Sequence, residues 1–277
     1  MSRSFSHNHS LAAPISASFR AVAVVLTLSL MGGIAMAQPP KDLAVFDAAG
    51  GETVVASGSI ASAFGKQIGA STMSALSLPL PTLLNGISIS VKDSAMVSRM
   101  ATLFFVSPNQ INFVIPDATA MGMATVTIMN GDATPPSTTV QVAVDAPGLF
   151  AANSQGTGVA AAIAIRRFIA TQMNVEVPVF HCDAGGCASD PIDLDSSSNV
   201  FLELFGTGIR GRSSLSNVSA TIGGTPVVVL FAGAQGQFPG LDQVNLALPM
   251  TLQAKGETDV VLTVDGQVAN KVRVNIH

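Results

Sequence analysis

The chain has 277 residues, of which 48% are hydrophobic and only 11% are charged, whereas an average soluble domain is about a quarter charged. Disordered chains are polar and highly charged, so this composition excludes global disorder. Only 13 lysines and arginines stand against 17 acidic residues, for a net charge of -4, and this lack of basic surface argues against nucleic-acid binding.

The N-terminus has the composition of a secretory signal peptide. Arg3 and Arg20 precede an apolar run, residues 21–37, which ends in Ala35-Met36-Ala37; this charged, apolar, small-x-small order is typical of such signals. An uncleaved anchor is the alternative, but the run is shorter than the roughly 20 residues of a membrane span. We predict that residues 1–37 are removed, that no membrane span remains, and that the protein is exported to the periplasm, the cell surface or the medium.

Two halves of the mature chain repeat each other. The matching segments are 64–65 with 205–206, 87–91 with 218–222, 109–116 with 242–249, and 130–131 with 265–266. The offset changes only between apolar runs, where loops absorb insertions, so we predict a tandem duplication. In this register Gln110 corresponds to Gln243, and Asn112 corresponds to Asn245.

Each half consists of short apolar runs broken by Gly, Pro, Asn and Asp, which is typical of a sandwich of antiparallel strands. Alternation of polar and apolar residues predicts that Phe113 in one half and Leu246 in the other point into separate cores. The runs 260–264 and 271–276 flank Asp265-Gly266, a pair suited to positive φ, and they predict a hairpin.

The boundary between the halves falls after 146–150, where Pro and Gly end the first half. Residues 151–198 are interpreted as a connecting stretch, within which the Ala-rich run 159–169 supports helix and strand equally. We therefore expect an all-β protein with two tandem immunoglobulin-like β-sandwich domains behind the signal peptide. Residues 38–150 form the first domain, and 151–277 form the connecting region and the second domain.

Four segments, taken together and in order, are characteristic. They are FFVSPNQIN (104–112), APGLF (146–150), LFGTGIRGR (204–212) and GLDQVN (240–245). The chain resembles the Solibacter-type C-terminal domain of exported acidobacterial proteins over residues 56–276. The resemblance implies tandem immunoglobulin-like domains of the IPT/TIG type, which often close larger surface proteins and carry no established activity.

Cys182 and Cys187 are the only cysteines. An exported protein meets an oxidising compartment, which favours a disulfide between them, and Gly185-Gly186 can adopt the positive φ values that a tight reversal needs. Free thiols are one alternative. A metal held by these cysteines with His181 and Asp183 is the other, although a structural zinc site wants four well-placed ligands, usually in paired spacings.

An acidic run follows the second cysteine. Asp190, Asp193 and Asp195 could offer oxygens to calcium. They lack the D-x-D-x-D-G loop with its distal glutamate, so a solvated acidic loop is the favoured interpretation.

The glycine-rich run 206–211 superficially looks like a phosphate-binding loop. No convincing helix follows it, whereas glycines at the end of a strand are typical of turns. We therefore expect no phosphate site, with Arg210 and Arg212 at the surface.

Enzymatic function is disfavoured. A Ser-His-Asp site needs a histidine as general base, and the mature chain keeps only His181 and His277, of which only His181 is internal. The G-x-S-x-G elbow of serine hydrolases is absent. We expect no catalytic, cofactor-binding or metal-binding residues.

Glycan-binding sandwiches commonly use Trp or Tyr platforms, and this chain has neither, while the phenylalanines of the mature chain lie in apolar runs typical of a core. An extracellular glycan-binding module is therefore the second hypothesis. The leading hypothesis is a non-enzymatic, exported structural or protein-interaction module, whose exposed strands or loops contact another protein or an envelope component.

Overall fold

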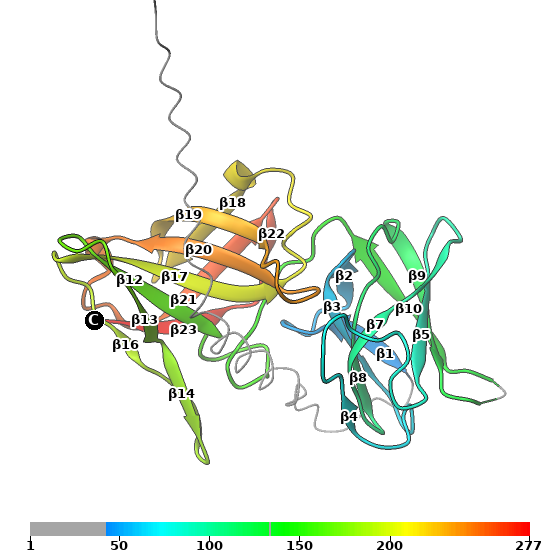
Figure 1. Ribbon diagram of the computed structural model, residues 1–277. Helices are drawn as coiled ribbons and strands as arrows, with labels where there is room; N and C mark the ends of the chain where they lie inside the picture. The colour runs from blue at the N-terminus through cyan, green and yellow to red at the C-terminus, as the bar shows by residue number, and fades with distance from the viewer. Residues whose placement is uncertain (1–42, 133) are drawn as a thin grey trace, which may run out of the picture.

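The computed structural model, which describes residues 43–132 and 134–277, is all-β and consists of two sandwiches in tandem (Figure 1). The predicted signal peptide, residues 1–37, lies outside the described residues. Within these ranges no helix is long and apolar enough to cross a membrane. The helical elements described there are two short 3-10 turns, η1 (Leu215–Asn217) and η2 (Met250–Leu252).

The first sandwich packs two five-stranded sheets face to face. Its strands are β1 (Ala44–Asp47), β2 (Val54–Ala56), β3 (Ile60–Phe64), β4 (Met73–Ser74), β5 (Ser88–Lys92), β6 (Ser98–Met100), β7 (Thr102–Val106), β8 (Gln110–Val114), β9 (Gly122–Met129) and β10 (Ser137–Ala143). One sheet has the order β1-β3-β8-β7-β4 and the other β2-β10-β9-β5-β6. Alternate residues point inward, as Ala124, Val126 and Ile128 of β9 do, so the two sheets enclose a core.

The second sandwich is one continuous sheet folded over on itself. Its strands are β11 (Gly148–Leu149), β12 (Ala162–Phe168), β13 (Asn174–Pro178), β16 (Pro191–Ile192), β17 (Ser198–Thr207), β18 (Val218–Ile222), β19 (Thr225–Ala234), β20 (Asp242–Leu248), β21 (Gly256–Val264), β22 (Gln267–Val268) and β23 (Val272–Ile276). The main order is β13-β12-β17-β20-β19-β18-β21-β23-β16. The sheet folds along β19, whose residues 225–227 pair with β18 and whose residues 228–234 pair with β20.

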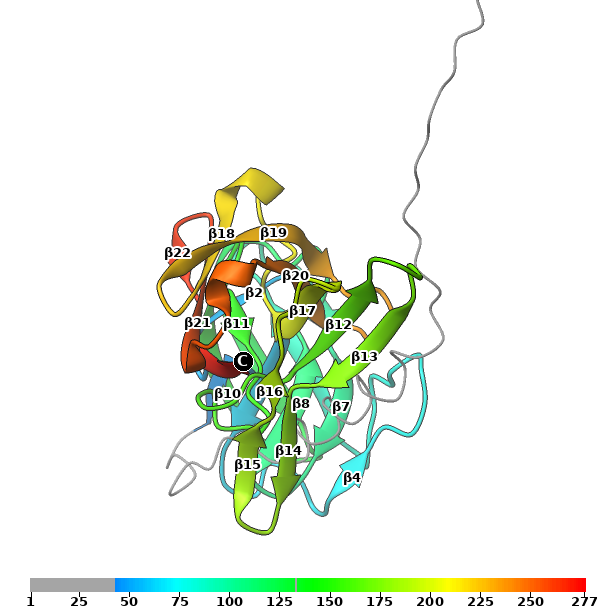
Figure 2. The same cartoon turned by 90° about the vertical axis from the view of Figure 1, so that its left-hand side faces the viewer.

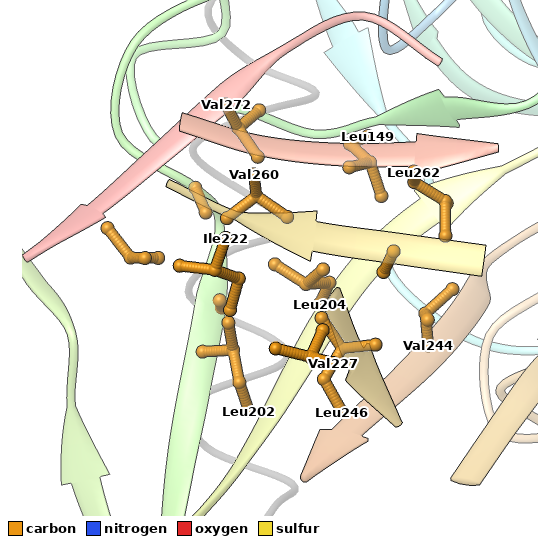
Figure 3. Packing of buried hydrophobic residues seen from close by; sticks show 14 of the residues in the cluster. Leu149, Leu202, Leu204, Ile222, Val227, Val244, Leu246, Val260, Leu262 and Val272 are labelled. Carbon is orange, nitrogen blue, oxygen red and sulfur yellow. The ribbon is translucent and has the colours of Figure 1, made fainter. Parts of the chain in front are cut away.

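Aliphatic side chains fill the core of the second sandwich. In Figure 3 they point toward one another from both parts of the sheet: Leu202, Leu204, Val244 and Leu246 from one part, and Ile222, Val260, Leu262 and Val272 from the other. Burial of this apolar surface is the main force that holds the two parts of the sheet together.

The two sandwiches share one topology, so the predicted repeat is confirmed. The orders β1-β3-β8-β7 and β2-β10-β9-β5 in the first correspond to β12-β17-β20-β19 and β16-β23-β21-β18 in the second. The register agrees as well, because Phe64 lies opposite Gln110 on β3 and β8, and Phe205 lies opposite Gln243 on β17 and β20. Duplicated sequence has therefore kept a duplicated sheet order.

Side chains in the repeated segment match too. Gln110 Nε2 donates to Asn112 Oδ1 over 2.9 Å, and Gln243 Nε2 donates to Asn245 Oδ1 over 2.7 Å. Phe113 and Leu246, the residues that follow these asparagines, are both fully buried, each in the core of its own sandwich. The predicted register and the predicted inward direction of these two residues are confirmed.

The stretch 151–198 is not simply a connection, which corrects the sequence analysis. It contributes β12, β13 and β16 to the second sandwich, and the ambiguous run 159–169 contains strand β12. Ala162 and Ala164 face the core of the second sandwich while Ile163 is buried on the opposite face. A strand buried on both faces shows no polar alternation, so its periodicity could not identify it.

The predicted hairpin at Asp265-Gly266 is confirmed. Both residues have positive φ, 46° and 86°, as the turn requires. The return strand is interrupted: β22 pairs with the end of β21, and β23 pairs with its beginning. On β23 buried residues alternate with residues that are partly or fully exposed, so one face of the strand is accessible to solvent as predicted.

Candidate functional site

A third cluster of buried apolar residues lies between the two sandwiches. Its members are Ala49, Ile60, Leu80, Phe104, Phe105 and Val114 from the first sandwich, with Phe150, Ala161, Ile163, Phe205 and Leu241 from the second sandwich and the linker, residues 144–150, that leads into it. Each of the four characteristic segments contributes at least one residue to this junction cluster. These segments therefore meet in a packed interface.

A buried hydroxyl joins the sandwiches beside this cluster. Thr207 has no exposed surface; its Oγ1 accepts the backbone N–H of Ile60 over 2.7 Å and donates to the carbonyl of Gly240 over 2.9 Å. The first bond crosses between the sandwiches, and it satisfies a backbone donor at the start of β3 that would otherwise be buried without a partner.

Arg210 is not a free surface residue, contrary to the prediction. Its Nε donates to Asp242 Oδ1 over 2.7 Å and its Nη2 donates to the carbonyl of Leu241 over 2.9 Å. Asp242 has no exposed surface, and its Oδ2 accepts the backbone N–H groups of Ile209 and Arg210. Burial raises the pKa of Asp242 above its usual range, and the guanidinium and the N–H donors oppose this rise.

The glycines of the run 206–211 allow close packing against the linker. A Cβ on Gly208 would collide with the carbonyl oxygen of Ala146, and one on Gly211 would collide with that of Val144. Gly208 also has a positive φ of 70°, a backbone conformation that residues other than glycine rarely adopt. The run therefore holds the linker backbone in place. Arg212, expected at the surface, is half-buried, and its Nε has no hydrogen-bond partner among the described residues.

The disulfide between Cys182 and Cys187 is present. It closes a hairpin of β14 (Phe180–Asp183) and β15 (Gly186–Ser189), in which the two cysteines lie directly opposite each other. Their Cα atoms are 4.0 Å apart, closer than the usual separation of about 5.5–6 Å. In Figures 1 and 2 this hairpin projects away from the second sandwich, and most of its residues are exposed.

The acidic residues near the hairpin take separate partners. Asp190 Oδ1 lies 2.7 Å from His181 Nδ1, and Asp193 Oδ1 lies 3.6 Å from His277 Nδ1. Asp195 accepts from Arg166 Nη1 over 2.7 Å, and serine donors at 197 and 198 together with this cation lower its pKa to about 2. Within 43–132 and 134–277 no three His, Cys, Asp or Glu side chains are grouped so that they could hold a metal ion.

A shallow polar pocket of about 690 Å³ opens beside the linker. It is lined by Val144, Asp145, Ser213, Ser216, Asn217, Ser219, Thr263, Asp265 and Gly266. Ser213 donates to Asp265 from both its backbone N–H and its hydroxyl, which lowers the pKa of Asp265. Burial, with the nearby charge of Asp265, raises the pKa of Asp145, whose Oδ2 is buried without a hydrogen-bond partner in the described part of the chain.

Sequence reasoning missed this pocket. Its two carboxylates, Asp145 and Asp265, are far apart in the chain, and the segments beside them, 146–150 and the turn 265–266, carry no signal of a pocket. Asp265 was identified only as a turn residue. Its pairing with Ser213 depends on how the 208–217 connection folds back, so no local signal could have revealed it.

Comparisons with known proteins add little to this geometry. No protein-family profile and no curated protein matches the chain. Among solved structures, "Titin Ig tandem domains A164-A165" is 10% identical and has a TM-score of 0.23, over 81% of this chain and 91% of that one. "Dpr2 Ig1-Ig2 in complex with DIP-Theta Ig1-Ig3" is 9% identical with a TM-score of 0.25, over 84% of this chain and 64% of that one. At these scores the assignment of the fold rests on the sheet order.

Proposed function

We propose that this protein is an exported, non-enzymatic structural and protein-interaction module, in which two sandwiches act as one rigid unit. The observation that carries the proposal is the convergence of the four characteristic segments on the junction cluster. Residues such as Arg210 and Asp242, which could have formed a reactive site, instead satisfy each other and the surrounding backbone. The four characteristic segments thus hold the two sandwiches together as a rigid unit, as a scaffold requires.

The surface that contacts the partner is, in this proposal, the disulfide-closed hairpin. It projects from the second sandwich (Figure 2), and its tip at Ala184 is exposed. A crosslinked hairpin loses less conformational freedom when it binds, so more of its contact energy appears as affinity. The predicted partner is another protein or an envelope component.

Photo-crosslinking in intact cells tests this assignment. Benzoylphenylalanine at Ala184 should capture a specific partner, whereas the same residue at Gln267, an exposed position on β22, should not. Equal capture from both positions, or none from Ala184, would overturn the role of the hairpin.

Rigidity is tested separately on the mature chain by NMR relaxation. Amides of both sandwiches should report one rotational correlation time, because the junction cluster couples them. Two distinct correlation times would show independent tumbling and contradict the proposed scaffold.

We also propose membership of the Solibacter-type family, with domains 38–150 and 151–277 behind a cleaved signal peptide. The order of the four segments supports the family, and the signal-like composition of residues 1–37 supports export, as does the disulfide, because such bonds persist in oxidising compartments. Intact-mass analysis of exported protein should give a chain that begins at Gln38. Retention of residues 1–37 would reject the signal.

Glycan binding is the second candidate, favoured by the polar pocket around Asp145 and Asp265. Hydroxyl, amide and carboxylate groups line it together, and such groups recognise sugar hydroxyls. A glycan-array screen should then detect a ligand whose binding is lost in Asp145→Ala and kept in Asp132→Ala, an exposed carboxylate elsewhere. Absence of any glycan signal would reject this candidate.

A further inference from the structure

Within residues 43–132 and 134–277, one edge of the second sandwich has no strand paired to it. Between Val228 and Ala234, strand β19 pairs with β20 on one side. No described strand pairs with the other side, because β18 pairs only with residues 225–227. Alternate backbone N–H and C=O groups along this edge are therefore available to another strand.

The first sandwich closes the corresponding edge with its own chain. There, β7 pairs with β8 on one side and with the short strand β4 on the other. Two further backbone bonds of 2.8 Å extend this cover: Ala75 N–H donates to the carbonyl of Phe104, and Leu103 N–H donates to the carbonyl of Pro81. An antiparallel strand at this position is thus part of how the fold is completed.

Strands β7 and β19 occupy equivalent places in the two sandwiches, and each has a β-bulge at the corresponding position. The register of β7 with β8 shifts between Leu103 and Phe105, and the register of β19 with β20 shifts between Val229 and Phe231. Both shifts lie opposite the repeated Gln-x-Asn segment. The backbone groups of Val229 and Leu230 therefore correspond to those that bond the covering segment in the first sandwich.

The second sandwich lacks the cover because its connection is shorter. The chain between the equivalent strands runs from 65 to 87 in the first sandwich and only from 208 to 217 in the second. The shorter connection goes directly through η1 into β18, with no residues left to form a strand beside β19.

The chemistry of the open edge suits pairing. Val228, Leu230 and Phe231 are 63%, 48% and 38% exposed, and residues 228–234 include no charge and no proline. Sheet edges that must stay unpaired usually carry lysine, other charged residues or proline, which discourage pairing with another strand. Residues 228–234 contain none of these.

We propose that β19 of a second copy of this chain occupies the edge, so that two molecules pair β19 with β19 antiparallel across a two-fold axis. Identical antiparallel strands are self-complementary, because each offers the other the same donors and acceptors. No like charges meet along the pair, and the exposed apolar side chains of both copies leave water together. This association goes beyond the proposed function and uses a surface separate from the β14–β15 hairpin.

The test compares two lysine substitutions in the mature chain. Val228 on β19 and Val268 on β22 are both valines and are both 63% exposed, so neither substitution buries a charge and both variants should fold. Sedimentation velocity should give a dimer for the unmodified chain and for Val268→Lys, and a monomer for Val228→Lys. Hydrogen exchange of the amides of 229–232 should slow with rising protein concentration in the unmodified chain and in Val268→Lys, and should not depend on concentration in Val228→Lys.

Several results would overturn the proposal. These are a monomer at every concentration, a dimer that persists in Val228→Lys, and a dimer lost equally in Val268→Lys. A strand from a different protein found on this edge, with the chain itself monomeric, would also exclude self-pairing. The crosslinking experiment can be repeated with benzoylphenylalanine at Ala184 in the Val228→Lys variant. If that variant still captures a partner, the role of the hairpin holds even where self-pairing through β19 is lost, so the two proposals can fail independently.

Discussion

The hydroxyl of Thr207 accepts a hydrogen bond from the backbone N–H of Ile60 over 2.7 Å, although 147 residues separate the two in sequence. The bond joins the end of β17 to the start of β3, which are equivalent strands of the two repeats. It therefore ties the two sandwiches together between the end of one strand and the start of its counterpart in the other repeat.

Replacing Thr207 with valine should destabilise the protein by about 1–3 kcal/mol, because the buried N–H of Ile60 loses its acceptor. Thr207→Ser keeps the hydroxyl and should recover most of the loss. Urea denaturation of the three proteins gives the comparison. A valine variant as stable as the parent would mean that water or another acceptor replaces the hydroxyl.

Phe113→Ala and Leu246→Ala should each cost about 2–5 kcal/mol, because each removes a fully buried side chain from a separate core. Met123→Ala is the control, since Met123 is 54% exposed on β9. Denaturant midpoints measure all three variants. A midpoint equal to that of the parent for either core variant would contradict the packing described for that sandwich.

The double variant Cys182→Ser, Cys187→Ser should remain folded with the same far-ultraviolet circular dichroism. Closing so short a loop stabilises the native state by only about 2 kcal/mol in the chain-entropy view, whose mechanism is disputed. Faster hydrogen exchange should be confined to 180–195. Global unfolding of the variant would assign the disulfide a larger role than its place in a projecting hairpin suggests.

Acid should weaken the first sandwich through Asp93. The N–H of Ala120, with that of Val97 and the guanidinium of Arg99, lowers the pKa of Asp93 from 3.8 to about 2. Because the folded pKa lies below the unfolded one, the stabilisation is present above about pH 4 and is lost as the pH falls toward 2.

Asp93→Asn should accordingly be less stable than the parent at neutral pH and lose less stability across that acid window. Thermal unfolding at a series of pH values gives the slope of Tm against pH for the parent and for Asp93→Asn. Asp132→Asn, at an exposed position, is the control. Asp195, whose pKa is also about 2, titrates in the same window, so the slope should flatten without vanishing. An unchanged slope in Asp93→Asn would contradict this account.

The repeat was predictable because each matching segment is short and continuous in sequence. The Gln-x-Asn segment and the apolar runs around it can be recognised in each half from a few neighbouring residues. Strand β12 was not predictable, because its first four residues, 162–165, are apolar on both faces and so lack alternation. The role of Arg210 was equally hidden, since its partner Asp242 lies 32 residues away and only the folded sheet brings them together. Sequence reasoning thus identified the fold class and one register, but not the contacts between distant segments.

The parallel pairings in the two sandwiches have a mechanical consequence. In each sandwich an early strand lies parallel to the last one, β2 beside β10 and β16 beside β23. Tension applied to the start of the early strand and the end of the last strand would pull the two past each other, so the hydrogen bonds of the pair would be loaded in shear and would break together. The same tension on an antiparallel pair joined by a turn would separate the strands one hydrogen bond at a time.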